Sequence, residues 1–169
     1  NDGDYTLVIA KGPKQSESFY TGNPGEEKIF RTYNYNYTGL AVKSTTLFGY
    51  TDTDTLELSV TVRGQAALTS IDELTTEIKQ SVSFYAGNEG EEKVQKTYNY
   101  NFDGSKIKTI TEYSYPVDAL EMTTTWRAQD NDGDYTLVIA KGPKQSGSFY
   151  TGTPGDEKIF RTYNYNYTG

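Results

Sequence analysis

Tyrosine and asparagine alternate in an octapeptide that occurs three times in the chain. TYNYNYTG begins at Thr32 and again at Thr162, and TYNYNFDG begins at Thr97. Tyrosine rings can stack on pyranose rings and asparagine amides can bind sugar hydroxyls, so the alternation could form a carbohydrate-binding platform. The candidate platform residues are Tyr33, Tyr35, Tyr98, Tyr100, Tyr163 and Tyr165. On a strand, the same alternation also gives an aromatic ladder that stabilises stacked strands without a ligand, and its reuse in every copy favours this structural interpretation.

Alternating carboxylates form the best metal candidate. Asp130, Asp132 and Asp134 surround a glycine in the sequence DNDGD, and Ca²⁺ prefers oxygen ligands of this kind. The distal glutamate of an EF-hand loop is missing, and the corresponding stretch of the preceding repeat, QAALT, has no carboxylate. We therefore favour a solvated acidic turn, with Ca²⁺ as the alternative, and expect no other cofactor.

Two of the three octapeptides contain an acceptor pattern for N-linked glycosylation. Asn36 and Asn166 each begin an Asn-Tyr-Thr triplet, whereas Asn101 is followed by Phe and Asp. Asn36 and Asn166 are therefore the glycosylation candidates.

Composition excludes several functional classes. The chain has neither cysteine nor histidine, so it lacks disulfides, Cys-based metal sites and the usual nucleophile–histidine pairs. Adjacent carboxylates such as Glu26 and Glu27 would point to opposite faces of a strand and could not act as an acid–base pair. The net charge of −7 argues against a nucleic-acid partner. No apolar run reaches the about 18 residues of a membrane span. We expect that the protein is not an enzyme.

Alternation with a period of two between turn signals predicts an all-β fold. The residues that share a face are Leu56, Leu58, Val60 and Val62; Leu120, Met122, Thr124 and Trp126; Tyr135, Leu137 and Ile139; and Tyr33, Tyr35 and Tyr37. Short turns containing Gly, Asp and Pro separate these runs, which favours an antiparallel meander with four or five strands per repeat.

Residues 70–80 carry conflicting signals. Ser70 and Glu73 form a capping box, and the apolar residues that follow have helical spacing. The equivalent stretch, which begins at Tyr135, alternates like a strand and contains Pro143. Because equivalent positions of one array should share a backbone, we predict a strand at 70–80.

The octapeptide is part of a longer repeat. Residues 18–39 align without gaps on 83–104 and 148–169, which gives a period of 65 residues. Residues 1–39 and 131–169 differ at only three positions, so the units alternate between two types and the chain is expected to be a window of a longer array. The predicted organisation is a partial repeat at 1–25, a unit of type A at 26–90, a unit of type B at 91–155 and the start of the next unit at 156–169.

Such arrays bury a core by stacking neighbouring units. The expected fold is therefore an all-β, tandem-repeat antiparallel meander wound into an extended sheet, a solenoid or a fibre.

The octapeptide resembles the T-Y-x-Y-D-x-x-G motif of bacterial YD repeats, also called RHS repeats. The residues that match are 32–39, 97–104 and 162–169, with Asn36, Asn101 and Asn166 where that family usually has aspartate. The period of 65 residues is longer than the family's. The resemblance implies a strip of β-hairpins wound into an extended sheet or shell. Proteins of this family are usually secreted or surface-borne, and some bind carbohydrate or enclose a toxin.

Two functional hypotheses follow. The first is a structural segment of a giant extracellular or cell-surface protein, in which neighbouring copies meet head to tail and form a filament or stalk. The second is a carbohydrate-binding or adhesin array whose multivalency comes from repetition. Exposure of Tyr33, Tyr98 and Tyr163 separates them, because a buried ladder indicates packing and an exposed row indicates a platform.

Overall fold

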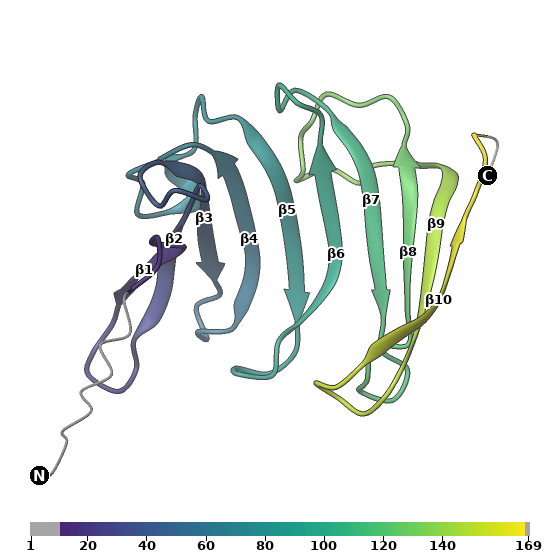
Figure 1. The fold of residues 1–169 in the computed structure, drawn as a ribbon, viewed down its shortest axis with the longest axis horizontal. Coiled ribbons are helices and arrows are strands. Elements are labelled where there is room, and N and C mark those ends of the chain that lie inside the picture. Colours follow the sequence, from purple (N-terminus) through teal and green to yellow (C-terminus); the bar gives the residue numbers. More distant parts are fainter. Residues whose placement is uncertain (1–10, 168–169) are drawn as a thin grey trace, which may run out of the picture.

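Ten strands form one open antiparallel sheet in sequence order (Figure 1). The computed structural model describes residues 11–167. The strands are β1 (Ser16–Thr21), β2 (Lys28–Tyr35), β3 (Val42–Tyr50), β4 (Leu56–Arg63), β5 (Lys79–Ala86), β6 (Lys93–Tyr100), β7 (Ile107–Ser114), β8 (Met122–Ala128), β9 (Lys141–Thr151) and β10 (Lys158–Asn164). Each strand pairs antiparallel with the next. The predicted all-β meander is confirmed, and each complete repeat contributes four strands, β1–β4 and β5–β8.

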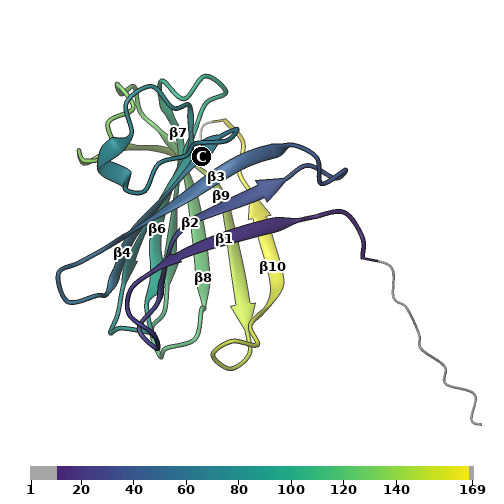
Figure 2. The same cartoon turned by 90° about the vertical axis from the view of Figure 1, so that its left-hand side faces the viewer.

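The two outermost strands lie at opposite ends of the sheet (Figure 1). Within residues 11–167, neither β1 nor β10 has a strand on its outer side. The sheet is therefore not closed, and it twists along its length (Figure 2).

The hydrophobic core lies on one face of the sheet and is centred on β4 to β7. Alternation places every second side chain on this face, so Val60 and Val62 of β4 lie beside Val82 of β5, and all three are fully buried. The buried core cluster consists of Val60, Val62, Ala66, Val82, Tyr98, Tyr100, Ile107, Ile110 and Ile139. Its members come from strands of both repeats, so the two units share one core.

Two long loops cover this core. Residues 64–78 connect β4 to β5 and residues 129–140 connect β8 to β9, and both loops lie on the same side of the sheet (Figure 2). Ala66 and Ile139 of these loops are buried in the core cluster, and Ile71 and Tyr135 pack against it. The loops thus act as a second layer that excludes water from a single sheet.

The loops correct two predictions. Residues 70–78 are not a strand: they contain one 3₁₀ turn, Ile71–Glu73, in which the Ser70 side chain accepts a hydrogen bond from the Asp72 N–H. Tyr135, Leu137 and Ile139 also lie outside any strand. Both segments were expected to share a backbone class, and both are loops. Their apolar residues follow a strand-like or helix-like spacing because they pack down onto the sheet from above.

The tyrosine motif spans a strand end and a turn. β2 ends at Tyr35, and Tyr37 lies in the turn that follows, where it is highly exposed. The prediction that Tyr37 shares the face of Tyr33 and Tyr35 was therefore wrong. Gly39 closes the turn with a φ of +71°, a conformation that favours glycine.

The structural repeat departs from a uniform offset of 65 residues in one strand. Thr46 pairs with Thr61, whereas Thr111 pairs with Thr125, so β8 is equivalent to β4 at an offset of 64. This offset aligns Arg63 with Arg127. The hairpin between β7 and β8 is shorter by one residue, and the loop before β9 restores the length.

The opposite face of the sheet is rich in hydroxyl groups that pair across neighbouring strands. The pairs are Ser18–Thr32 at 2.9 Å, Thr46–Thr61 at 3.0 Å, Ser83–Thr97 at 2.9 Å, Thr111–Thr125 at 3.0 Å and Ser148–Thr162 at 2.9 Å. Each hairpin repeats the same contact, which fixes the register on the polar face.

Candidate functional site at the junction between repeats

The first tyrosine of each motif is a packing residue when strands lie on both of its sides. Tyr33 is 5% exposed and Tyr98 is 2% exposed, whereas Tyr163 on the edge strand β10 is 45% exposed. Tyr100 is also buried. Tyr33, Tyr98 and Tyr100 therefore have no open ring face for a sugar, and the platform interpretation is wrong for these residues.

The same aromatic contact holds this tyrosine in every copy. Its ring meets a phenylalanine of the preceding strand in an edge-to-face arrangement. The ring centroids are 5.1 Å apart for Phe19–Tyr33, 5.4 Å for Phe84–Tyr98 and 5.9 Å for Phe149–Tyr163. The recurrence identifies the tyrosine as part of the repeat's own packing.

The second tyrosine of each motif has a different environment in each copy. Tyr100 donates a hydrogen bond to the Gly133 carbonyl at 2.8 Å, and burial raises the pKa of its phenol. Tyr35 donates to Glu17 at 2.9 Å, and Lys144 lies 5.3 Å from the ring centre of Tyr165. Tyr165, which lies just beyond the end of β10, is the most exposed of the three.

The asparagine of the motif organises the turn. Asn36 Oδ1 accepts hydrogen bonds from the Thr38 hydroxyl at 2.8 Å and the Leu40 N–H at 3.2 Å. Asn101 plays the same part, since its Oδ1 accepts from the Lys106 N–H at 3.1 Å. This backbone role explains why asparagine recurs whether or not the glycosylation triplet is present. Asn166, the second glycosylation candidate, is exposed.

The three aspartates of the metal candidate do not converge. Asp130 forms an ion pair with Lys106, which lowers the pKa of the carboxyl group. Asp132 accepts from the Asp134 N–H at 3.1 Å, and Asp134 accepts from the Thr136 N–H at 2.9 Å. Within residues 11–167, no group of three or more carboxylates is arranged to hold a metal ion.

Asn131, which the sequence analysis did not single out, anchors this loop to β7. Its Oδ1 accepts from the Ile107 N–H at 2.9 Å, and its Nδ2 donates to the Ile107 carbonyl at 3.0 Å. The Asn131 side chain therefore makes with Ile107 the pair of hydrogen bonds that a neighbouring strand would otherwise make. Only its place between two aspartates marked it in the sequence.

A glutamate in the turn of one hairpin binds the start of a strand in the preceding hairpin. Glu92 Oε1 accepts from the Leu56 N–H at 2.9 Å, and Glu157 Oε1 accepts from the Leu120 N–H at 2.9 Å. These hydrogen bonds lower the pKa of both carboxyl groups. The sequence signal for this role was present: a glutamate occupies positions 27, 92 and 157, one repeat apart.

An arginine binds at the other end of the same strand. The Arg63 guanidinium lies 4.5 Å from the ring centre of Phe102, and its Nε donates to the Phe102 carbonyl at 3.0 Å. Arg127 lies 5.1 Å from the ring centre of Tyr167. In both cases the ring belongs to the turn of the tyrosine motif two strands away. The turn after β6 therefore contacts the end of β4, and the turn after β10 contacts the end of β8.

A third contact holds the middle of the strand. The Ser59 hydroxyl lies 3.2 Å from the Tyr85 hydroxyl, and the Thr123 hydroxyl lies 3.4 Å from the Tyr150 hydroxyl. The hairpins β5–β6 and β9–β10 thus hold the strands before them, β4 and β8, through a glutamate, a tyrosine hydroxyl and an aromatic ring. We call this set of three contacts the junction.

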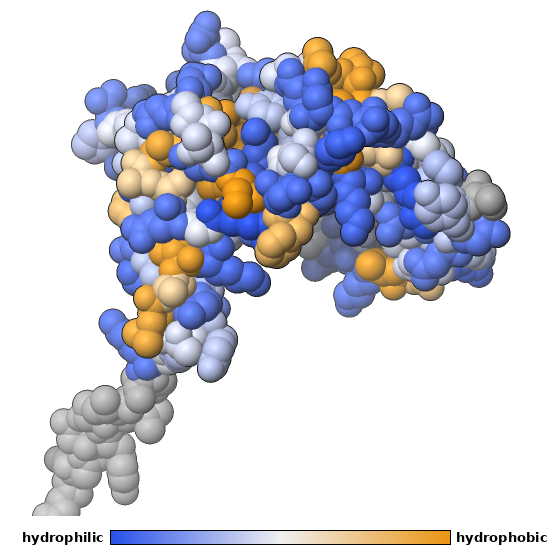
Figure 3. Space-filling model, turned by 90° about the horizontal axis from the view of Figure 1, so that it is seen from above, coloured by the Kyte–Doolittle hydropathy of each residue, from blue (hydrophilic) through white to orange (hydrophobic). Residues whose placement is uncertain are grey.

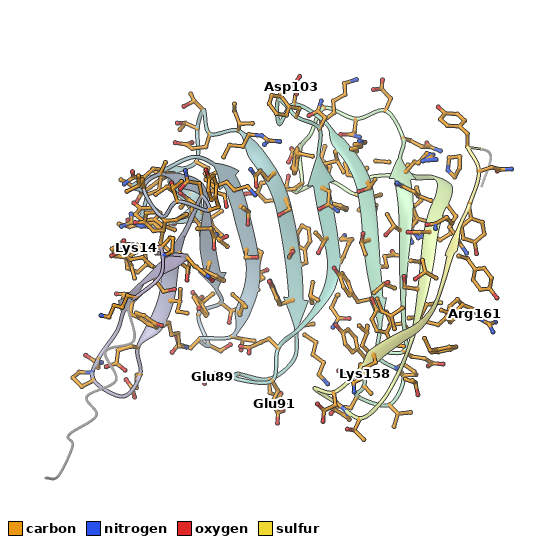
Figure 4. All side chains as sticks on the ribbon, in the orientation of Figure 1. Lys14, Glu89, Glu91, Asp103, Lys158 and Arg161 are labelled. Atoms are coloured by element: carbon orange, nitrogen blue, oxygen red, sulfur yellow. The ribbon has the colours of Figure 1, made fainter. Side chains whose placement is uncertain are left out.

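A lysine makes the corresponding contact with the hairpin that follows. Lys28 lies 3.1 Å from Asp54 Oδ1, and Lys93 forms an ion pair with Asp118. The equivalent residue on β10 is Lys158, which lies at the end of the sheet together with Arg161 (Figure 4). Within residues 11–167, Lys158 has no ion-pair partner. Lys158 on β10 is therefore available to pair with an aspartate of a hairpin that follows, as Lys28 and Lys93 do.

A hollow of about 540 Å³ lies at the start of β7 and the end of β8 and is open to solvent. Its lining includes the Lys106–Asp130 ion pair, Arg127 and Tyr167. The upper end of the molecule is mainly hydrophilic, with separate apolar patches rather than one continuous apolar surface (Figure 3).

Comparisons of the chain with protein-family models, with curated proteins and with solved structures found no match. In the part of the chain that the structure describes, no helix has the length and apolar character required to cross a membrane.

Proposed function

We propose that this chain is a structural segment of an extracellular or cell-surface protein, in which tandem repeats stack into one continuous sheet and form a filament or stalk. The observation that carries the proposal is the recurrence of the junction: the same three contacts join the β5–β6 hairpin to β4 and the β9–β10 hairpin to β8. Contacts that repeat in this way propagate without closing.

Two further observations support a structural role. The first tyrosine of the motif is buried where strands lie on both of its sides, at Tyr33 and Tyr98, as a stacking ladder requires. The free end of the sheet at β10 presents the unused half of a recurring contact, because Lys158 is equivalent to Lys28 and Lys93, which pair with Asp54 and Asp118. The resemblance of the octapeptide to YD repeats supports placement outside the cell.

Electron microscopy of a polypeptide with four copies of the 130-residue period tests the proposal. We expect thin, unbranched strips of constant width. A string of separate globules, or one compact particle, would refute the structural role.

Carbohydrate binding is a second candidate at one location. Tyr163 and Tyr165 are exposed at the edge strand, so their rings could stack on a sugar. A glycan microarray probed with the chain and with the Tyr163→Ala variant tests this role. Binding that the substitution removes would support the role, and absence of binding would refute it.

A further inference from the structure

Three hairpins carry the same set of receiving residues at the same spacing. Each set contains a tyrosine, a glutamate seven residues later and an aromatic residue ten residues after that. The sets are Tyr85, Glu92 and Phe102; Tyr150, Glu157 and Tyr167; and Tyr20, Glu27 and Tyr37. The first two sets hold β4 and β8, respectively, through the junction contacts.

The strands that are held also share a spacing. β4 presents the Leu56 N–H, the Ser59 hydroxyl and the Arg63 guanidinium, and the second set holds the equivalent groups of Leu120, Thr123 and Arg127. The shared pattern is Leu-x2-Ser/Thr-x3-Arg. The leucine of this pattern contributes only its backbone N–H to the junction. The side chains that the junction contacts are those of the serine or threonine and of the arginine.

The third receiving set faces solvent. Tyr20 is 57% exposed, whereas its equivalents Tyr85 and Tyr150 are partly buried against the strand that each holds. Tyr37 is 92% exposed, against 83% for Phe102 and 80% for Tyr167, so its exposure differs little from theirs. The difference is that within residues 11–167 no arginine stacks on the Tyr37 ring, whereas Arg63 and Arg127 stack on the other two. Glu27 is exposed as well.

Glu27 is already oriented for its role. Its Oε2 accepts from the Gly25 N–H at 3.0 Å, as the Oε2 of Glu157 accepts from the Gly155 N–H at 3.0 Å. In Glu157, the other oxygen holds the Leu120 N–H. The carboxylate of Glu27 is thus fixed by its own turn, with Oε1 left for a strand.

We infer that the outer edge of β1, with Tyr20, Glu27 and Tyr37, is a docking site for one extended strand of the pattern Leu-x2-Ser/Thr-x3-Arg, supplied by another repeat unit. The inference rests on the proposed function, because it takes the partner to be another repeat of the same kind. Pairing with β1 would give the incoming strand its backbone hydrogen bonds. Tyr20, Glu27 and Tyr37 would select which strand binds and in which register.

The exposed edge of a second copy does not fit this site. Its two edge strands, β1 and β10, have the sequences SESFYT and KIFRTYN, and both lack the pattern. The strands that carry the pattern, β4 and β8, are paired on both sides in every copy. The occupant is therefore a β4-type strand with an unpaired edge, and a folded second copy cannot supply one.

A fluorescent peptide of residues 54–64, DTLELSVTVRG, tests the inference against the whole chain. Fluorescence anisotropy reports binding. We expect the peptide to bind the chain and expect Tyr37→Ala in the chain to weaken binding by about two- to fivefold, the range of an exposed cation–π contact. Arg63→Ala in the peptide should weaken binding to a similar extent, and the two changes together should add little, because they remove the same contact.

Leu40→Ala in the chain is the matched control, because Leu40 is an exposed apolar residue in the same turn as Tyr37. This variant should bind the peptide as the unaltered chain does. Absence of binding, or equal effects of Tyr37→Ala and Leu40→Ala, would overturn the inference. If longer polypeptides form strips in the electron microscope but the chain does not bind the peptide, this docking site is refuted and the structural function stands. If the chain binds the peptide but longer polypeptides form no strips, the docking site stands and the structural function is refuted.

Discussion

Tyr98 and Tyr163 occupy the same position of the repeat in different surroundings. Tyr98 is buried between two strands, and Tyr163 lies on the edge strand. We predict that Tyr98→Ala lowers the free energy of unfolding by about 3–5 kcal/mol, because it removes a buried aromatic side chain. Tyr163→Ala should cost about 1 kcal/mol or less. Urea denaturation measures both values, and equal losses would show that neighbouring strands do not create the aromatic ladder.

Glu92 makes the stability of the junction depend on pH. The Leu56 N–H lowers the pKa of Glu92 below its ordinary value of 4.5. A carboxyl group with a lowered pKa in the folded state stabilises the protein above its unfolded pKa, and this contribution is lost as the pH falls through the folded value. We predict that Glu92→Gln flattens the loss of stability between about pH 5 and pH 3.

Glu57→Gln provides the control for this prediction, since Glu57 is an exposed glutamate of β4 outside the junction. Thermal unfolding at a series of pH values gives the comparison. If Glu92→Gln and Glu57→Gln have the same acid dependence, the bond from Leu56 does not stabilise the fold.

At the residue scale, the sequence showed which residues recur but not how deeply each is buried or which group it contacts. The alternation of the octapeptide left open whether Tyr33 packs in a ladder or binds a sugar, and the burial of its ring favours packing. Burial depends on the neighbouring strands and on the covering loops, which no local pattern encodes. Glu92 was missed because its partner, the Leu56 N–H, is a backbone group 36 residues away.

At the scale of elements, the two long loops supply two of the nine buried residues of the core cluster, Ala66 and Ile139. Ile139 is 8% exposed, whereas the adjacent Val138 is 97% exposed. We predict that Ile139→Ala lowers the free energy of unfolding by about 2–4 kcal/mol and that Val138→Ala changes it by less than about 0.5 kcal/mol. Chemical denaturation of the two variants checks the prediction. Similar values would mean that residues 129–140 do not cover the sheet as a packed layer.

Strands and loops differed in how well they could be predicted. β4 was predicted correctly because Leu58, Val60 and Val62 alternate with polar residues over a whole strand. Residues 135–139 show the same alternation but form a loop, because a short segment that packs onto a sheet also places alternate residues inward. The one-residue shift of β8 was invisible in the alignment, since two compensating length changes in turns restore the period.

At the scale of the whole molecule, the open sheet connects the repeat to its proposed function. Two repeats share one core, and the same junction holds the β5–β6 hairpin to β4 and the β9–β10 hairpin to β8. Because each complete unit adds four strands, the sheet keeps its antiparallel alternation when a further unit is joined. Length can therefore grow without any new type of contact.

Solution X-ray scattering of polypeptides with increasing numbers of 65-residue units tests this account most directly. Four strands at a spacing of about 4.8 Å predict that each added unit lengthens the particle by about 19 Å while its cross-section stays constant. A maximum dimension that stops growing, or a cross-section that expands with each unit, would contradict a continuous stack of repeats.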